Sequence, residues 1–182
     1  MRTWKNYFSL TLMALLIGGA SVSARATTSD PMVNFFYQGF GSLKDEAATA
    51  REEGKLGLFV MFDDPDCPWC AKMKATVLNQ AEVQEYFRKY FRPIHLDTKG
   101  DTQLVDFAGK EWLEKDYAFK GHRVRATPVF IFFDTNGKIM LRYTGATRSV
   151  EEFLWLGEFV VSGAYKNKTF TAYKRERTQA TN

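Results

Sequence analysis

Residues 59–74 read FVMFDDPDCPWCAKMK and contain the only two cysteines of the 182-residue chain, Cys67 and Cys70. The apolar run leading into this stretch predicts a buried strand over residues 56–62, and the Asp- and Pro-rich segment after it ends that strand. A helix is expected to begin at or near Cys67, because proline at position 68 suits the first helical position. The cysteine pair therefore lies where a buried strand gives way to a helix.

This position favours ionisation of Cys67. Unpaired N–H groups and the positive end of the helix dipole stabilise an anion at a helix N-terminus. We therefore expect the pKa of Cys67 to lie below that of a free cysteine, so that it is a thiolate nucleophile near neutral pH. Cys70 lies one turn further along and points the same way, which predicts a resolving thiol that attacks a mixed disulfide on Cys67.

Other uses of a Cys-x-x-Cys pair fit less well. Structural zinc needs four ligands, and only His95 and His122 remain to complete a site. A c-type haem needs His after the second cysteine, where Ala71 stands. A structural disulfide closing so short a loop would constrain the unfolded chain little. The sequence favours redox chemistry with no metal and no cofactor, and leaves open a redox-inert peptide-binding module or a Cu(I) carrier.

The start of the chain predicts export. Arg2 and Lys5 precede an apolar core over residues 8–17, and small residues follow up to Ala24. This pattern is typical of a signal peptide over residues 1–24, cleaved after Ala24 or alternatively after Ala26. The apolar run is shorter than the roughly 20 residues that a spanning helix needs. We expect the protein in the periplasm, an oxidising compartment in which a working dithiol must be reduced again by a partner.

The remaining residues predict one domain with a short extension at each end. We assign residues 25–41 to an N-terminal extension, 42–164 to the domain and 165–182 to a basic polar tail. The whole chain has a net charge of +4, but the tail carries five basic residues against one acid, so the rest is close to neutral. We expect no nucleic-acid partner, a monomer, and a tail that is solvated and partly disordered.

Capping and turn signals give the order of the elements. Ser42 is a plausible N-cap for a helix over residues 42–54, and Ser149 with Glu152 forms a capping box that opens the last helix. Between them we predict the following elements: the cysteine helix to about residue 78, a helix over 81–91, a strand over 93–97, a turn or short helix over 101–110, a helix over 111–119, a strand from Pro128 to residue 133 and a hairpin strand over 138–143.

This order, with Cys67-Pro68-Trp69-Cys70 after a buried strand and Thr127-Pro128 before the hairpin, resembles the thioredoxin superfamily. The resemblance implies an α/β fold, a central mixed β-sheet flanked by helices, here with a helical insertion before the proline strand. It also implies a cis peptide bond before Pro128, facing the cysteines. By this analogy Cys67 and Cys70 are catalytic, and Pro68, Trp69, Thr127 and Pro128 bind an extended substrate segment.

Two features depart from cytosolic thioredoxins. Those proteins have a buried Asp six residues before the first cysteine, where it helps to move the proton of the resolving thiol, whereas this chain has Met61. If a carboxylate assists here, Asp63 or Asp64 is the candidate, although both could be solvated loop charges together with Asp66. Pro-Trp between the cysteines replaces the Gly-Pro of those reductases.

The sequence therefore predicts an exported thiol–disulfide oxidoreductase. Within the superfamily the chain looks most similar to exported proteins of the sulfur-oxidation (SoxW) type. The expected partners are protein clients with thiols or disulfides, and an electron donor in the periplasm or its membrane. We expect a reductase, because a single domain without a dimerisation module resembles the dedicated reductases more than the isomerases; oxidase or isomerase activity is the alternative.

Overall fold

The computed structural model describes residues 28–37 and 41–181. The predicted signal peptide and part of the predicted N-terminal extension lie outside these residues. Within the described ranges, none of the helices combines the length and the apolar character needed to cross a bilayer.

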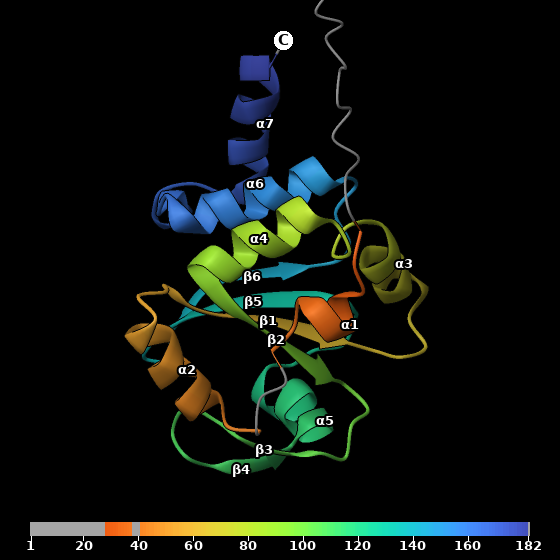
Figure 1. Cartoon of the computed structure of the whole chain (residues 1–182), viewed down its shortest axis with the longest axis vertical. Helices are drawn as coiled ribbons and strands as arrows, with labels where there is room; N and C mark the ends of the chain where they lie inside the picture. The colour runs from red at the N-terminus through yellow and green to blue at the C-terminus, as the bar shows by residue number, and fades with distance from the viewer. Residues whose placement is uncertain (1–27, 38–40, 182) are drawn as a thin grey trace, which may run out of the picture.

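A four-stranded mixed sheet forms the centre of the fold (Figure 1), with the strand order β2-β1-β5-β6. β1 spans Gly57–Asp63 and pairs in parallel with β2, Phe91–Asp97. On its other edge β1 pairs antiparallel with β5, Val129–Asp134, which continues into β6, Ile139–Thr144. The predicted α/β fold with a central mixed sheet is confirmed.

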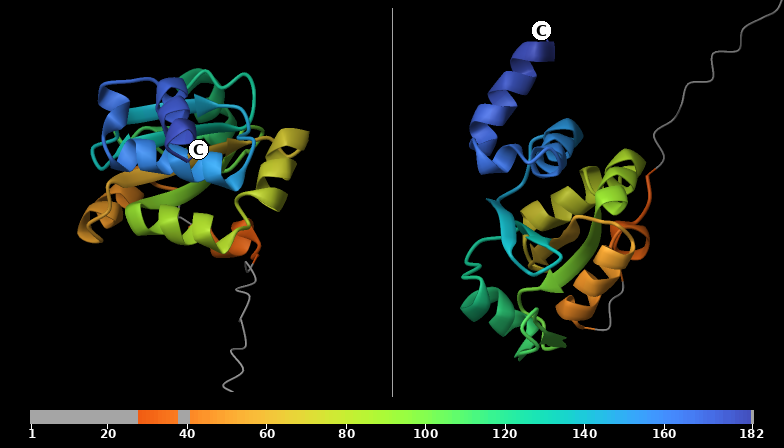
Figure 2. Two further views of the ribbon diagram at one scale, coloured as in Figure 1. Left: turned by 90° about the horizontal axis from the view of Figure 1, so that it is seen from above. Right: turned by 90° about the vertical axis from the view of Figure 1, so that its left-hand side faces the viewer.

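The side chains of β1 alternate between two apolar cores, because successive residues of a strand point to opposite faces. Phe59 and Met61 belong to the core shared with α3 (Pro68–Thr76), α4 (Ala81–Tyr90) and α6 (Val150–Val161). Leu58, Val60 and Phe62 belong to the core shared with α2 (Leu43–Glu52). Figure 2 shows the resulting arrangement, with helices on both sides of the sheet.

Local capping signals place the helix starts where the sequence predicts them. The Ser42 hydroxyl accepts from the N–H of Asp45 at 3.2 Å and opens α2. The Ser149 hydroxyl accepts from the N–H of Glu152 at 3.1 Å and opens α6. The return bond of this box differs from expectation, since the Glu152 carboxylate accepts from the N–H of Arg148 instead of that of Ser149.

The insertion before β5 is only partly helical. The helix predicted over residues 111–119 is wrong in its first turn, because β3 (Gln103–Val105) and β4 (Glu111–Leu113) form an antiparallel hairpin. Its turn is built on the Asp106 carboxylate, which accepts from two backbone N–H groups and from the indole N–H of Trp112. Helical turns follow as α5, Glu114–Asp116, and a π-helix, η1, at Tyr117–Gly121.

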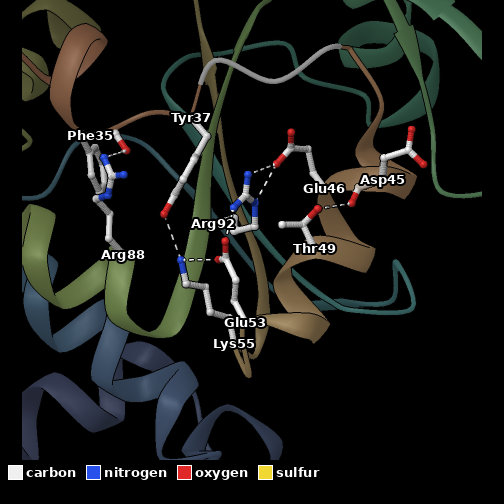
Figure 3. Close-up of polar contacts among 9 residues, drawn as sticks. All are labelled: Phe35, Tyr37, Asp45, Glu46, Thr49, Glu53, Lys55, Arg88 and Arg92. Atoms are coloured by element: carbon white, nitrogen blue, oxygen red, sulfur yellow. Dashed lines mark hydrogen bonds and ion pairs between the residues drawn. The ribbon is translucent and has the colours of Figure 1, made fainter.

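Side-chain contacts hold the N-terminal segment against the folded domain. A short helix, α1 (Pro31–Asn34), is followed by two buried aromatic side chains, Phe35 and Phe36. Figure 3 shows Tyr37 between α2 and β2, where Lys55 donates to its hydroxyl at 3.0 Å. The guanidinium of Arg92 lies 4.0 Å from the ring centre of Tyr37 and pairs with Glu46 and Glu53.

The C-terminal residues also differ from prediction. A 3-10 turn, η2 (Ala164–Lys166), leads into α7, Phe170–Thr181. α7 contacts α6 through the rings of Phe170 and Tyr173 on Phe159. Ion pairs join Lys174 to Glu152 at 2.6 Å and Arg177 to Glu158 at 2.9 Å. The expectation of a partly disordered tail is therefore wrong for these residues, because their aromatic and basic side chains pack on Phe159 and pair with Glu152 and Glu158 of α6.

Candidate active site

Cys67 is the N-cap of α3 and has an extended backbone, with φ −84° and ψ 115°, while Pro68 occupies the first turn. This confirms the predicted start of the helix. The Cys67 thiol is partly exposed and lies 3.3 Å from the carbonyl oxygen of Thr127, to which it donates. Cys70 is fully buried in the core between α3 and the sheet. Only one of the two sulfur atoms can therefore meet a molecule from outside.

The two thiols have opposite electrostatic environments. Burial alone would raise the pKa of Cys67, but interactions with the Thr127 side chain and with the backbone N–H groups of Cys70 and Trp69 outweigh it, and the net pKa is lowered. Burial raises the pKa of Cys70 to about 12. The pair thus consists of an accessible acidic thiol and a buried thiol that holds its proton.

The peptide bond between Thr127 and Pro128 is cis, as the resemblance implies. Pro128 directly precedes β5, and its carbonyl accepts from the N–H of Gly145 at 2.8 Å. β5 pairs with β1, so the Thr127–Pro128 bend lies at the same end of the sheet as the cysteine helix. Trp69 is 57% exposed beside Cys67. The six residues predicted to form the site therefore gather at one end of β1.

Asp63, the last residue of β1, is buried beneath this site. Its Oδ2 accepts from Lys74 Nζ at 2.5 Å and lies 2.8 Å from His95 Nε2. Burial alone would raise its pKa, but interactions with the side chains of His95, Lys74 and Cys70 lower it to about 2. The other oxygen, Oδ1, is buried and accepts no hydrogen bond from the described residues. An ionised carboxylate with a free acceptor atom therefore lies next to the buried thiol.

The other two acids of the loop behave differently. Asp64 and Asp66 both pair with Lys99 at 2.8 Å, and the side chain of Asp66 is 84% exposed. The interpretation as solvated loop charge thus fits Asp66 and is wrong for Asp63. His122, the other histidine, packs against the rings of Phe62 and Tyr117. Burial lowers the pKa of His122 to about 4, which fits a structural role.

The sequence matches the family of thioredoxin-like domains over residues 43–161. The chain belongs to this family. No curated protein sequence matches it. Two solved structures share its fold: a thioredoxin-fold protein from Helicobacter pylori (18% identity, TM-score 0.58, covering 68% of this chain and 84% of the other) and a thioredoxin from Thermus thermophilus (23% identity, TM-score 0.53, covering 68% and 88%). At these identities the likeness shows the fold alone.

This thioredoxin-like site includes two residues that the sequence analysis did not assign to it, Lys74 and His95. His95 is the cross-strand partner of Met61 in β2, so it lies diagonally from Asp63 on the same face of the sheet. The parallel pairing of β1 and β2 was the signal that could have found it. Among the described residues, no group of three or more His, Cys, Asp or Glu side chains could hold a metal ion.

The unequal thiols predict selective alkylation. In the reduced protein, iodoacetamide should label Cys67 with an apparent pKa below that of a cysteine in an unstructured peptide, and should leave Cys70 unlabelled near neutral pH. Rates measured across pH, with mass spectrometry to locate the label, test this. Equal labelling of both cysteines, or titration of Cys67 like the control peptide, would contradict the assigned environments.

The Asp63 cluster predicts a specific loss of stability in acid. The pKa of Asp63 is lower in the folded than in the unfolded state, so its contribution is present above about pH 5 and disappears as the pH falls towards 2. A lowering of this size corresponds to on the order of 2 kcal/mol. Asp63→Asn should lose that part of the pH dependence in urea unfolding at pH 5 and pH 2, whereas Asp66→Asn, an exposed control, should keep it. Parallel curves for Asp63→Asn and the wild type would refute the assignment.

Proposed function

We propose that this protein is a thiol–disulfide oxidoreductase that reduces disulfides in exported protein clients. The observation that carries the proposal is the unequal cysteine pair, with Cys67 accessible and acidic beside Thr127 and Cys70 buried behind it. Membership of the thioredoxin-like family supports the same chemistry. A redox-inert module would have no need of two thiols in such different environments.

The reaction consists of two exchange steps. The Cys67 thiolate attacks one sulfur of a client disulfide, a mixed disulfide forms, and the other client sulfur leaves as a thiolate. Cys70 then loses its proton and attacks the Cys67 sulfur, which releases the second client thiolate and leaves a Cys67–Cys70 disulfide. The client gains two electrons and the protein loses two, so an external dithiol donor must return the pair to its reduced form.

Asp63 is the proposed acceptor of the Cys70 proton. The buried thiol must be deprotonated before it can attack, and its pKa of about 12 makes this unfavourable without a base. Asp63 Oδ1 is buried with no hydrogen-bond donor among the described residues, so it is placed to relay this proton onward, although a carboxylate with a pKa of about 2 does not keep it. Lys74 and His95 hold the carboxylate in place through Oδ2. Asp64 is directed to Lys99 instead, which favours Asp63 over Asp64.

The proposed direction of transfer depends on the same charge. A protein oxidises its clients when its thiolate form is strongly stabilised. The lowered pKa of Cys67 acts in that direction, whereas the buried negative charge of Asp63 opposes a thiolate in the pair and favours the disulfide. We propose that the second effect prevails, which gives the pair a low reduction potential and makes the protein a reductase.

The proposed setting is the periplasm, with an electron donor there or in its membrane. It rests on the signal-peptide pattern of residues 1–24 and on the oxidising conditions outside the cytoplasm, where protein clients with disulfides occur. Within the family, the approach to the cysteines over residues 62–67 and the insertion before Thr127 support a relation to the sulfur-oxidation type of exported thioredoxin-like protein.

Trapping tests the two-step reaction. Cys70→Ala should accumulate mixed disulfides between Cys67 and its clients, because the resolving group is missing, and reducing agent should release them. The wild type should reduce a disulfide substrate with a dithiol donor, and Cys67→Ser should lose this activity by at least about a hundredfold. Full activity in Cys67→Ser would exclude the proposed nucleophile.

The direction can be measured independently. Equilibration of the Cys67–Cys70 pair with glutathione or dithiothreitol buffers should give a potential at or below about −200 mV. Asp63→Asn should shift the potential to a less negative value, because the neutral side chain no longer opposes the Cys67 thiolate of the reduced pair. A wild-type potential near −120 mV, typical of strong oxidants, would sink the assignment as a reductase.

A further inference from the structure

Two exposed aromatic side chains lie on the two segments that border the accessible sulfur. Five large hydrophobic side chains are exposed in the described part of the chain. Two of them are Trp69 at 57%, two residues after Cys67, and Phe119 at 56%, which lines a pocket together with Thr127, the residue whose carbonyl accepts from the Cys67 thiol. Trp69 belongs to α3, and Phe119 belongs to η1 in the insertion. Exposed aromatic residues of this kind commonly anchor a binding partner.

Phe119 and Thr127 line the same pocket beside the site. The pocket measures about 320 Å³, and its lining includes Asp64, Lys99, Phe119, Arg125 and Thr127. The Thr127 carbonyl that accepts from Cys67 belongs to the same residue. A client segment that brings its disulfide to Cys67 would therefore place a neighbouring side chain in this pocket.

The segment that carries Phe119 and Arg125 is anchored from below. Tyr117, Ala118 and Val124 are buried in the core under α2 and β1, while Phe119 and Arg125 are exposed. The N–H groups of residues 122, 123 and 124 donate to the carbonyls of residues 117, 119 and 118. The exposed side chains thus project from a turn with a fixed backbone, which lowers the entropy cost of binding.

A cation lies over each of the two aromatic rings. Lys72 Nζ is 5.4 Å from the ring centre of Trp69, and the Arg125 guanidinium is 5.7 Å from that of Phe119. Within the described part of the chain, neither cation pairs with a carboxylate. The acids of the site are engaged elsewhere, because Asp64 and Asp66 both pair with Lys99. The three cations Lys72, Lys99 and Arg125 and the two acids Asp64 and Asp66 have a net charge of +1. Lys72 and Arg125 are the two cations that pair with neither acid.

We propose that Lys72 and Arg125 select client segments that carry an acidic side chain next to the disulfide cysteine. The aromatic ring under each cation contacts the aliphatic part of the client side chain, and the cation pairs with its carboxylate. This surface deepens the proposed function, since it rests on Cys67 being the point at which clients are attacked. It adds a charge preference that the cysteine pair itself cannot supply.

Matched peptides test the preference. Each peptide contains one disulfide and has Glu, Gln or Lys on both sides of the attacked cysteine; its reduction is followed with a dithiol donor. The wild type should reduce the Glu peptide about two- to fivefold faster than the Gln peptide, in terms of kcat/KM, and the Lys peptide more slowly still. The preference should be large in about 0.01 M salt and nearly absent in about 1 M salt, where the Debye length falls from roughly 30 Å to 3 Å.

Two variants and one matched control assign the effect. Lys72→Gln and Arg125→Gln should each lower the Glu-to-Gln ratio, and the double variant should bring it close to one. Lys89→Gln is the control, because Lys89 is also exposed and lies 5.1 Å from an aromatic ring centre, that of Tyr90. It precedes β2, at the end of the sheet opposite to Cys67, so it should leave the ratio unchanged.

A binding measurement separates this proposal from the redox chemistry. Peptides with Ser in place of both cysteines should bind the wild type with the same order, Glu before Gln before Lys, by titration of tryptophan fluorescence. If no peptide is reduced but this order and its dependence on Arg125 persist, the redox function fails and the docking surface stands. If Glu, Gln and Lys peptides are reduced and bound equally, or if Lys72→Gln and Arg125→Gln change all three by the same factor, the docking surface is refuted.

Discussion

The burial of β1 along its whole length is the constraint on which the rest of the structure depends. All seven residues of Gly57–Asp63 are buried, with apolar partners on both faces of the strand. Such a strand can only lie in the middle of a sheet that is covered on both sides. Its position fixes where the chain emerges, and the residues that emerge are the loop before Cys67 and the start of α3.

The same constraint forces a charge into the interior. Because the strand remains buried to its last residue, Asp63 cannot reach solvent and must be compensated inside the protein. Lys74 from α3 and His95 from β2 provide this compensation on one oxygen. Removing two charges from water costs several kcal/mol per ion, so the cluster is a poor device for stability alone. Its position beside Cys70 instead suits a role in the proposed reaction, and that role explains why the cluster is present despite its cost in stability.

Features set by neighbouring residues could be predicted from the sequence, and features set by distant contacts could not. Ser42, Ser149 and Pro68 act on backbone groups a few residues away, so the starts of α2, α6 and α3 are found correctly. The hairpin at residues 103–113 depends on one carboxylate, that of Asp106, which organises the whole turn. α7 depends on matching side chains on α6. In the site, Cys67 and Cys70 are visible as a motif, whereas the burial of Asp63 becomes evident only when β2 is paired with β1.

These differences separate the site into two parts with different structural origins. The thiol chemistry is determined by β1, α3 and the partner strand β2, all of which belong to the buried framework. The proposed recognition surface is shared, because Trp69 and Lys72 belong to α3 whereas Phe119 and Arg125 belong to the insertion, which meets that framework at the buried residues Tyr117, Ala118 and Val124. The exposed side chains of Phe119 and Arg125 project away from this attachment, and neither is a hydrogen-bond partner of Asp63 among the described residues. In the proposed function, the part of client choice that depends on the insertion can therefore change without altering the Asp63 charges that act on Cys70.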